Sequence, residues 1–468
     1  MTYGLRGFKG LWWEPEQYRD WPRLLAEAGY TFFMLCYTFA PELGLRWRQP
    51  FRRADETIIR CLASDCAARG IELCLAVNPN IGGHAWTPDS ATLPFHPTAG
   101  RDWFRRYWQA RRPNEALDPD PPFRYGNAGD LALLADKLRR AADWGVRAFA
   151  LSLDDIDPSA LSPEFPSLAA AQVWLVEGVH AALGSGAEGA ATRDGPEGTP
   201  RLFFTPTYYW TVGLRAHSEY AAELAASLPP DVQVFWTGEH VRTPGPDLTR
   251  ASARDAARLL GRKPILWFNY ASNDSFRFAP QLPPGPPPGE DLGDEVGGVL
   301  VNPMRQASLT RLHALVMGAY LRDPAGYDHE VAVEGAARRL VGEDAAPWLL
   351  RCIAAWAAYP DTRTLGADLE REGAPLASAL LARLEPAYGQ LLAALASVER
   401  LDADYPLDRD GRLGAELRHG ADRFRLLVAA LRARVREDPS RGGVDAMLAE
   451  SDEETASDAR VVLDATIR

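Results

Sequence analysis

Eight short apolar segments recur along the first 300 residues, and each is followed by a segment of helical periodicity or by a loop. They lie at residues 5–9, 31–37, 71–78, 146–153, 202–209, 232–238, 264–270 and 298–302. Most are apolar at nearly every position, which is typical of parallel strands covered on both faces. Eight such strands alternating with helices predict an α/β fold of the (β/α)8 TIM-barrel type. A doubly wound parallel sheet is the alternative.

The strand patterns stop near residue 325, and helical patterns replace them. These patterns lie at residues 332–341, 346–357, 376–398 and 413–435. We therefore expect a barrel over residues 1–325, a helical C-terminal domain over 326–440, and an acidic, flexible tail over 441–468.

One connection is unusually long. Residues 79–129 follow the third expected strand and are rich in aromatic side chains. A long insertion at this end of a barrel is either a lid or binding platform over the site, or a locally packed loop. The sequence leaves both readings open.

Composition excludes several classes of partner. The formal net charge of −12 argues against a phosphate-binding surface, so nucleic acid is not expected. No apolar run approaches the length of a membrane span, and the first residues lack the apolar core of a signal peptide. The five cysteines are odd in number and lack zinc-ligand spacing. We expect a cytoplasmic protein without a membrane segment, metal or cofactor, and nothing indicates its oligomeric state.

Polar side chains gather where the apolar segments end. They are Asp154 and Asp155 directly after the fourth segment, Thr205, Thr207 and Tyr209 on the fifth, Thr237 on the sixth, Asn269 on the seventh with Asp274 after it, and Asn302 on the eighth. Part of this pattern arises simply because strands end where polarity begins. In a (β/α)8 barrel, however, the active site is built at the carboxyl ends of the strands.

The adjacent pair Asp154 and Asp155 is the most informative of these groups. Neighbouring side chains of a regular strand point to opposite faces, so both can serve one site only where the backbone turns. The sequence Ile-Asp-Pro at 156–158 supplies such a break. Two close carboxylates resist ionising together, which separates one ionised group from one protonated group. Glycoside hydrolysis requires that division of roles.

Five strand-end motifs in order resemble the family 84 glycoside hydrolases, the protein O-GlcNAcases and their bacterial β-N-acetylglucosaminidase relatives. The motifs are Ala-Phe-Ala-Leu-Ser-Leu-Asp-Asp-Ile at 148–156, Thr-Pro-Thr-Tyr-Tyr at 205–209, Phe-Trp-Thr-Gly at 235–238, Leu-Trp-Phe-Asn-Tyr-Ala-Ser-Asn-Asp at 266–274, and Gly-Val-Leu-Val-Asn-Pro at 298–303. The resemblance covers about residues 4–330 and implies a retaining β-N-acetylglucosaminidase that needs no metal or cofactor. Its substrate would be a carbohydrate or a glycoprotein.

The resemblance also implies roles for the two aspartates. Asp154 would accept the acetamido N–H of the substrate and orient the acetamido oxygen toward the anomeric carbon, giving an oxazoline intermediate. Asp155 would be the general acid and then the general base. Five more residues would bind the sugar. They are Tyr209 at the acetamido group, Asn269 at the reacting end, Asp274 at the outer hydroxyls, Asn302 along the pocket, and Gly7 through its backbone carbonyl.

The chain departs from the family pattern in its first two strands. Arg6, Lys9 and Trp12 replace a Glu, a Tyr and a Pro, and Thr38 replaces a Lys that contacts the sugar. Lys9 is a candidate to replace that missing cation, although the sequence does not fix its position. Two alternatives therefore stay open: a catalytically silent barrel that binds a glycan or glycoprotein, and a hydrolase of altered sugar specificity.

Overall fold

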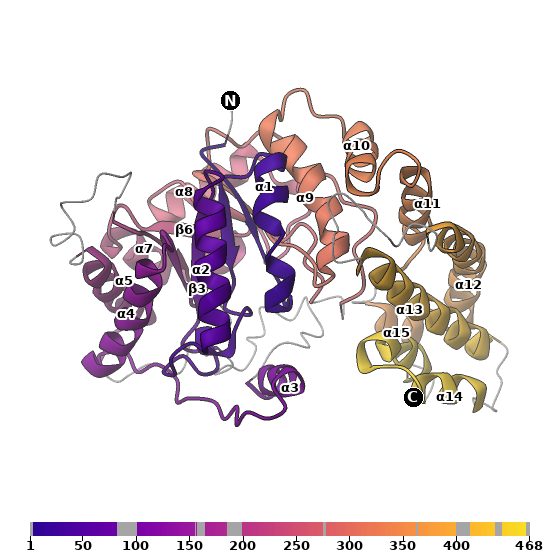
Figure 1. Cartoon of the computed structure of the whole chain (residues 1–468), viewed down its shortest axis with the longest axis horizontal. Helices are drawn as coiled ribbons and strands as arrows, with labels where there is room; N and C mark the ends of the chain where they lie inside the picture. Colours follow the sequence, from indigo (N-terminus) through magenta and orange to yellow (C-terminus); the bar gives the residue numbers. More distant parts are fainter. Residues whose placement is uncertain are drawn as a thin grey trace.

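The eight expected strands form a closed parallel barrel in sequence order (Figure 1). The computed structural model describes residues 3–81, 101–154, 156, 164–184, 199–274, 278–361, 364–398, 412–435 and 442–464. The strands are β1 Leu5–Lys9, β2 Phe32–Leu35, β3 Glu72–Val77, β4 Ala148–Ser152, β5 Arg201–Thr205, β6 Gln233–Trp236, β7 Ile265–Phe268 and β8 Gly298–Val301. β1 pairs with β8, with Leu5 opposite Gly298. This pairing closes the sheet, which confirms the barrel and excludes the doubly wound alternative.

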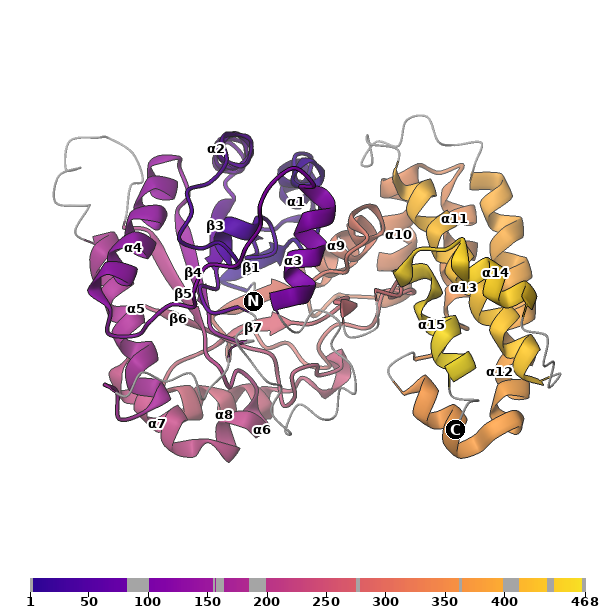
Figure 2. The ribbon, with the colours of Figure 1, turned by 90° about the horizontal axis from the view of Figure 1, so that it is seen from below.

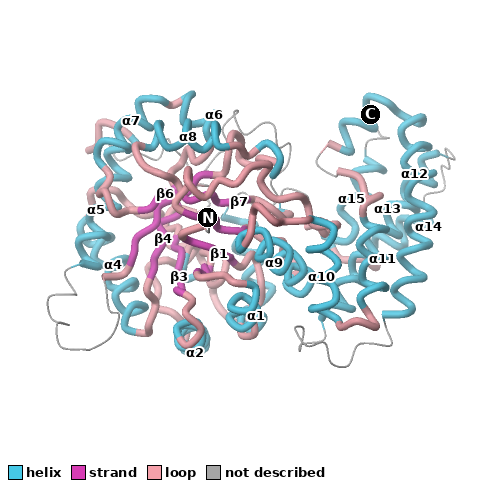
Figure 3. The backbone as a smooth tube through the Cα atoms, turned by 90° about the horizontal axis from the view of Figure 1, so that it is seen from above, coloured by secondary structure: helices cyan, strands magenta, loops and turns pink. Residues whose placement is uncertain are grey.

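Helices surround the barrel, as Figure 3 shows. They are α1 Trp21–Ala28, α2 Arg53–Ala67, α4 Ala128–Asp143, α5 Leu168–Gly184, α6 Thr211–Ala216, α7 Ser218–Ser227, α8 Arg250–Leu260 and α9 Ala307–Arg322. Between β7 and β8 the described residues 278–297 contain no helix, as the proline-rich sequence predicts. None of the helices that the structure describes is long and apolar enough to cross a membrane.

The strands separate two layers of apolar side chains. Phe32, Phe203 and Phe235 fill the interior, together with small residues such as Ala148 and Ala150. Large side chains facing small ones allow a narrow barrel to pack without voids.

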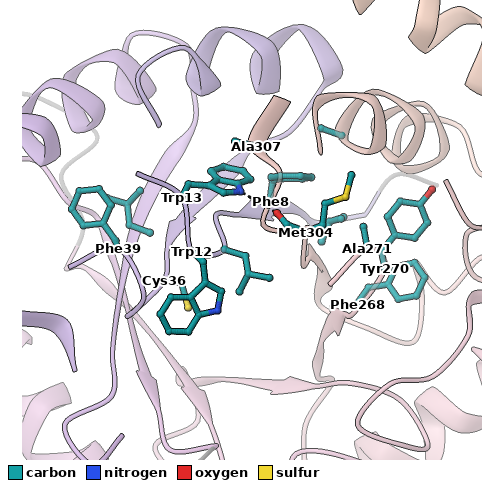
Figure 4. Packing of buried hydrophobic residues seen from close by; sticks show 14 of the residues in the cluster. Phe8, Trp12, Trp13, Cys36, Phe39, Phe268, Tyr270, Ala271, Met304 and Ala307 are labelled. Carbon is teal, nitrogen blue, oxygen red and sulfur yellow. Dashed lines mark hydrogen bonds between the residues drawn. The ribbon is translucent and has the colours of Figure 1, made fainter. Parts of the chain in front are cut away.

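Side chains on the opposite face of the strands pack under the helices. Phe8 stacks on Trp21 of α1 with ring centroids 5.1 Å apart, and Trp21 stacks on Trp13 at 4.5 Å. The indole of Trp13 donates a hydrogen bond to the carbonyl of Met304 at 3.0 Å (Figure 4). This aromatic layer fixes the segment that follows β1 against the segment that follows β8.

Six further helices form the C-terminal part of the chain, beside the barrel (Figures 1 and 2). They are α10 His329–Val341, α11 Ala346–Trp356, α12 Leu365–Val398, α13 Arg412–Val435, α14 Gly442–Ala449 and α15 Glu453–Asp464. The acidic stretch that we expected to be flexible therefore forms α14 and α15 over its described residues. The reason is a buried ion pair, Arg423 to Asp458 at 2.6 Å, together with the fully buried Val462. The acidic composition of this stretch therefore did not predict that its helices pack against α13.

The C-terminal helices contact the barrel near the carboxyl ends of its strands. The Glu416 carboxylate of α13 accepts hydrogen bonds from the backbone N–H groups of Ser308 at 3.1 Å and Leu309 at 2.8 Å. These N–H groups open α9, where a helix leaves its first donors unpaired and favours negative charge. Because α9 begins shortly after β8, Glu416 holds the C-terminal helical region beside the mouth of the barrel.

The described part of the long insertion is docked on the loops that follow β1 and β2. It includes α3 Arg101–Arg111, whereas residues 82–100 lie outside the described residues. The Arg112 guanidinium lies 2.9 Å from Glu42 and 2.7 Å from Asp55, and all three side chains are at most 2% exposed. The insertion from residue 101 onward is thus packed against the barrel, and whether the segment before it acts as a lid stays a prediction.

Replacing Arg112 tests how strongly this ion cluster anchors the insertion. Arg112→Leu leaves the buried Glu42 carboxylate without its cation and leaves Asp55 with Arg52 alone, so we expect the free energy of unfolding to fall by about 3–5 kcal/mol in urea titrations. Arg139→Leu is the control, because Arg139 and Asp136 form an exposed pair whose loss is expected to cost less than about 1 kcal/mol. Equal losses in both variants would contradict the anchoring role.

Candidate active site

A layer of polar side chains closes the apolar interior at the carboxyl ends of the strands. Every second residue of a strand faces the interior of the barrel. The residue two positions beyond the last interior position of a strand therefore continues the same face. These positions hold Lys9, Asn78, Ser152, Thr205, Thr237, Asn269 and Asn302, here called the polar mouth layer. Six different strands, β3 to β8, thus supply hydroxyl or amide groups to one end of the barrel, where (β/α)8 enzymes bind their ligands.

Several atoms of the polar mouth layer have unused hydrogen-bonding capacity. Within the part of the chain that the structure describes, Asn78 Nδ2, Ser152 Oγ, Thr205 Oγ1 and Asn302 Oδ1 are buried and lack a hydrogen-bond partner. Each such atom destabilises the folded chain by about 1–3 kcal/mol. Their concentration in one layer is typical of a site that binds a polar ligand.

Asp154 lies at the edge of this layer. It follows Ser152 by two residues and is partly exposed, while the Leu153 N–H still bonds to the Thr205 carbonyl at 2.9 Å. The Tyr37 hydroxyl donates a hydrogen bond to Asp154 Oδ2 at 3.4 Å. Asp155 lies outside the described residues, so the structure positions only the first carboxylate of the pair.

Tyr37 was missed by the sequence analysis. It lies two residues beyond the end of β2, and in the sequence an aromatic residue there cannot be distinguished from the continuation of an apolar strand. The phenol becomes recognisable only once β2 and β4 are known to flank β3 in the barrel.

The structure brings Asn269 and Asn302 together. Asn302 Nδ2 donates to Asn269 Oδ1 at 2.6 Å, and the same oxygen accepts from the Trp267 indole at 3.2 Å. Asn269 Nδ2 in turn donates to the Val241 carbonyl at 2.6 Å. These bonds fix the orientation of both amides, so Asn302 Oδ1 stays available at a defined place.

Asp274 is partly exposed on the loop that follows β7. The neighbouring Asn273 is fully buried and anchors this loop. Its Nδ2 donates to Gln306 Oε1 at 2.8 Å, and its Oδ1 accepts from the Arg305 N–H at 2.9 Å. Asp274 therefore extends from a loop that is tied to the segment after β8.

Tyr209 and Gly7 occupy different levels of the site. Tyr209 is partly exposed after β5, with its ring 5.2 Å from that of Trp210 at an angle of 73°. Gly7 lies in the middle of β1, one inward position below Lys9. A Cβ there would lie 2.9 Å from Leu300 Cδ1, so glycine is the residue that this narrow interior admits. The structure places Tyr209 at the rim and Gly7 beneath the polar mouth layer.

Two departures from the family pattern contact each other. The Trp12 N–H donates to Thr38 Oγ1 at 3.3 Å, and the Trp12 carbonyl accepts from the Tyr107 hydroxyl at 2.9 Å. Trp12 has a φ of 56°, a left-handed conformation that proline cannot adopt. A proline would also lack the N–H that Thr38 binds, so these two substitutions form one local structure that joins the loops after β1 and β2.

The described residues contain no group of three or more His, Cys, Asp or Glu side chains placed to hold a metal ion. What the site does offer is a carboxylate with a phenol beside it, oriented amides, unpaired hydroxyls and the Lys9 ammonium. This combination suits recognition of a neutral molecule with many hydroxyl and amide groups.

This chain is similar in sequence or in fold to several known proteins. The protein O-GlcNAcases of Rattus norvegicus and Mus musculus are each 27% identical over 208 residues, which is 43% of this chain and 21% of theirs. The match thus spans about a fifth of the length of these relatives. A mutant of the Thermobaculum terrenum O-GlcNAc hydrolase shares the fold with a TM-score of 0.62 at 16% identity, covering 99% of this chain and 94% of its own. The protein CpGH84B gives a TM-score of 0.60 at 18% identity, covering 99% and 77%.

The family comparison is the decisive one. The model of the β-N-acetylglucosaminidase family matches residues 115–353, just over half of the chain, from before β4 to beyond β8. The matched region contains Asp154, Tyr209, Asn269, Asp274 and Asn302. The chain therefore belongs to the β-N-acetylglucosaminidase family, glycoside hydrolase family 84.

Proposed function

We propose that this protein is a retaining β-N-acetylglucosaminidase that cleaves a terminal β-linked N-acetylglucosamine from a carbohydrate or glycoprotein with assistance from the substrate's own acetamido group. One observation carries the proposal. Asp154 stands at the carboxyl end of β4, hydrogen-bonded by Tyr37 and bordering the polar mouth layer, in a chain of this family.

The proposed first step uses no enzyme nucleophile. Asp154 accepts the acetamido N–H, which turns the acetamido oxygen toward the anomeric carbon and makes it more nucleophilic. That oxygen forms a bond to the anomeric carbon while the bond to the leaving oxygen breaks, giving an oxazoline. Asp155 supplies the proton to the leaving oxygen. Holding both reacting atoms in one molecule lowers the entropic part of the barrier.

The second step reverses the roles. Asp155, now ionised, takes a proton from a water molecule that attacks the anomeric carbon, and the oxazoline reopens with overall retention of configuration. Tyr209 would donate to the acetamido oxygen during both steps. Asn269 would hold the reacting end of the sugar, Asn302 would line the pocket, and Asp274 would bind the sugar's outer hydroxyls.

The partly exposed position of Asp154 fits this mechanism. A carboxylate that must stay ionised needs hydrogen-bond donors or solvent, and Tyr37, just after β2, supplies one donor.

We also propose that the protein is cytoplasmic, because all five cysteines are free thiols. They are Cys36, Cys61, Cys66, Cys74 and Cys352.

Asp154→Asn tests the substrate-assisted step. The amide cannot act as the anionic acceptor for the acetamido N–H, so we expect kcat on an aryl β-N-acetylglucosaminide to fall by about 10²–10⁴-fold. The matching aryl β-glucoside is the control substrate, because it lacks the acetamido group and should be inert with both enzymes. A wild type that hydrolyses neither glycoside would favour the alternative of a catalytically silent, glycan-binding barrel.

Asp155→Ala tests the general acid. Removing a proton donor matters most when the leaving group is a poor one, so hydrolysis of an alkyl glycoside should fall much further than that of a dinitrophenyl glycoside. Added azide should restore part of the second step in the variant by replacing activated water. Equal losses on both leaving groups would rule out Asp155 as the acid.

Tyr37→Phe tests the support of Asp154. Loss of one hydrogen bond to a charged group is expected to lower kcat/KM on the N-acetylglucosaminide by about 10-fold or more, with little change in Tm. Tyr18→Phe is the matched control, because the Tyr18 hydroxyl is buried and makes no hydrogen bond in the described structure. We expect that variant to keep its activity. Indistinguishable activities would show that the Tyr37 contact has no catalytic importance.

A further inference from the structure

Lys9 is the cation of the polar mouth layer. It is the last residue of β1 and continues the interior face of Leu5 and Gly7. Its side chain is only 3% exposed, and its ammonium lies 4.4 Å from the ring centroid of Trp267 on β7. The ammonium therefore points across the interior of the barrel toward β7, beneath the opening.

The described residues give the Lys9 ammonium neither a hydrogen bond nor an ion pair. Its contact with Trp267 is the only polar or charged interaction that the described residues give it. An ammonium can donate three hydrogen bonds, and a cation–π contact supplies none of them. A mostly buried ammonium that receives no hydrogen-bond acceptor or opposite charge from the described residues gains little stability from its position, so it is more easily explained by binding.

A comparison within the chain sharpens this contrast. Lys137 is also buried, at 8% exposed, but its ammonium donates to the carbonyls of Glu42 at 2.6 Å and Gln49 at 2.7 Å. Lys137 thus has the partners of a structural lysine. Lys9 is buried at least as deeply, and the described residues give its ammonium no such hydrogen bonds.

The surroundings of Lys9 indicate which ligand group would bind its ammonium. β1 pairs with β8 up to Phe8 and Val301, so the next pair in register is Lys9 and Asn302. Asn302 Oδ1 is the buried amide oxygen without a partner, and Asn302 Nδ2 binds Asn269. A donor and an acceptor that no described residue uses therefore lie at the same level, at the end of β1 and directly after β8. A sugar hydroxyl satisfies both together, because it accepts from the ammonium and donates to the amide.

The barrel order fixes the direction of approach. Asp154 follows β4, which is separated from β1 by β2 and β3. A sugar whose acetamido group is held by Asp154 would therefore present another edge of its ring to Lys9. That edge carries the ring hydroxyls.

We propose that Lys9 is a substrate-binding, specificity-determining residue whose ammonium binds one ring hydroxyl of the N-acetylhexosaminide, with Asn302 on the same hydroxyl. The proposal rests on the proposed function and extends it to the sugar's hydroxyl edge. It predicts that this enzyme discriminates against sugars that lack that hydroxyl, and that the discrimination depends on Lys9.

The test pairs an enzyme variant with altered substrates. Wild type, Lys9→Met and Lys9→Gln are assayed on the aryl β-N-acetylglucosaminide and on its 3-, 4- and 6-deoxy analogues. We expect Lys9→Met to lower kcat/KM on the parent sugar by about 10- to 100-fold, as for loss of a charged hydrogen bond. One deoxy analogue should show a similar loss with wild type but little further loss with the variant, because both changes remove the same contact. Lys9→Gln retains a donor and should recover part of the activity.

Stability separates a binding role from a structural one. Removing a mostly buried charge to which the described residues give no hydrogen bond or ion pair should leave Tm unchanged or raise it in Lys9→Met. Lys137→Met is the matched control and should lower Tm without changing the pattern among the deoxy sugars.

Three results would overturn the proposal. They are unchanged kcat/KM in Lys9→Met, an equal further loss on every deoxy analogue, or a drop in Tm like that of Lys137→Met. A wild type that is inactive on the parent sugar would instead overturn the proposed function, and this inference with it.

Discussion

The closed parallel barrel imposes a strict alternation of side chains, and the rest of the structure depends on that constraint. Each inward position must be filled by a side chain of the right size, so Phe32 and Phe203 lie among alanines and Gly7 leaves room for Leu300. One step further along the same face, the side chains become polar. The site is thus the upper end of the core, built by continuing the packing pattern with residues that bind rather than fill.

Parts of the chain outside the strands hold this upper end in place. Arg112 binds the insertion to Glu42 and Asp55, and Glu416 binds the C-terminal helical region to the start of α9. Both attachments are on the side of the barrel where the strands end. They attach the insertion to the segment that follows β2, and the C-terminal helices to the segment that follows β8. A rigid frame around a polar layer suits a mechanism that depends on orientation more than on an enzyme nucleophile.

Much of this could be predicted from the sequence, because parallel strands buried on both faces leave continuous apolar runs. All eight strands, the proline-rich connection and the change to helices were recognisable in this way. Asn269 and Asn302 were recognisable as strand-end amides, but their hydrogen bond depends on the register of β7 and β8. Lys9 could not be placed, since its inward direction depends on which residues of β1 face the interior. The helices at 442–464 were missed because the acidic composition gave no sign of the Arg423–Asp458 pair.

The central claim is that the barrel mouth binds a sugar through its acetamido group at Asp154. A crystal structure with a stable thiazoline analogue of the bicyclic intermediate tests it most directly. The account predicts the sugar ring inside the mouth, with the thiazoline nitrogen about 3 Å from the Asp154 carboxylate. A ligand bound in the mouth with its thiazoline ring turned away from Asp154, or bound elsewhere on the chain, would contradict it.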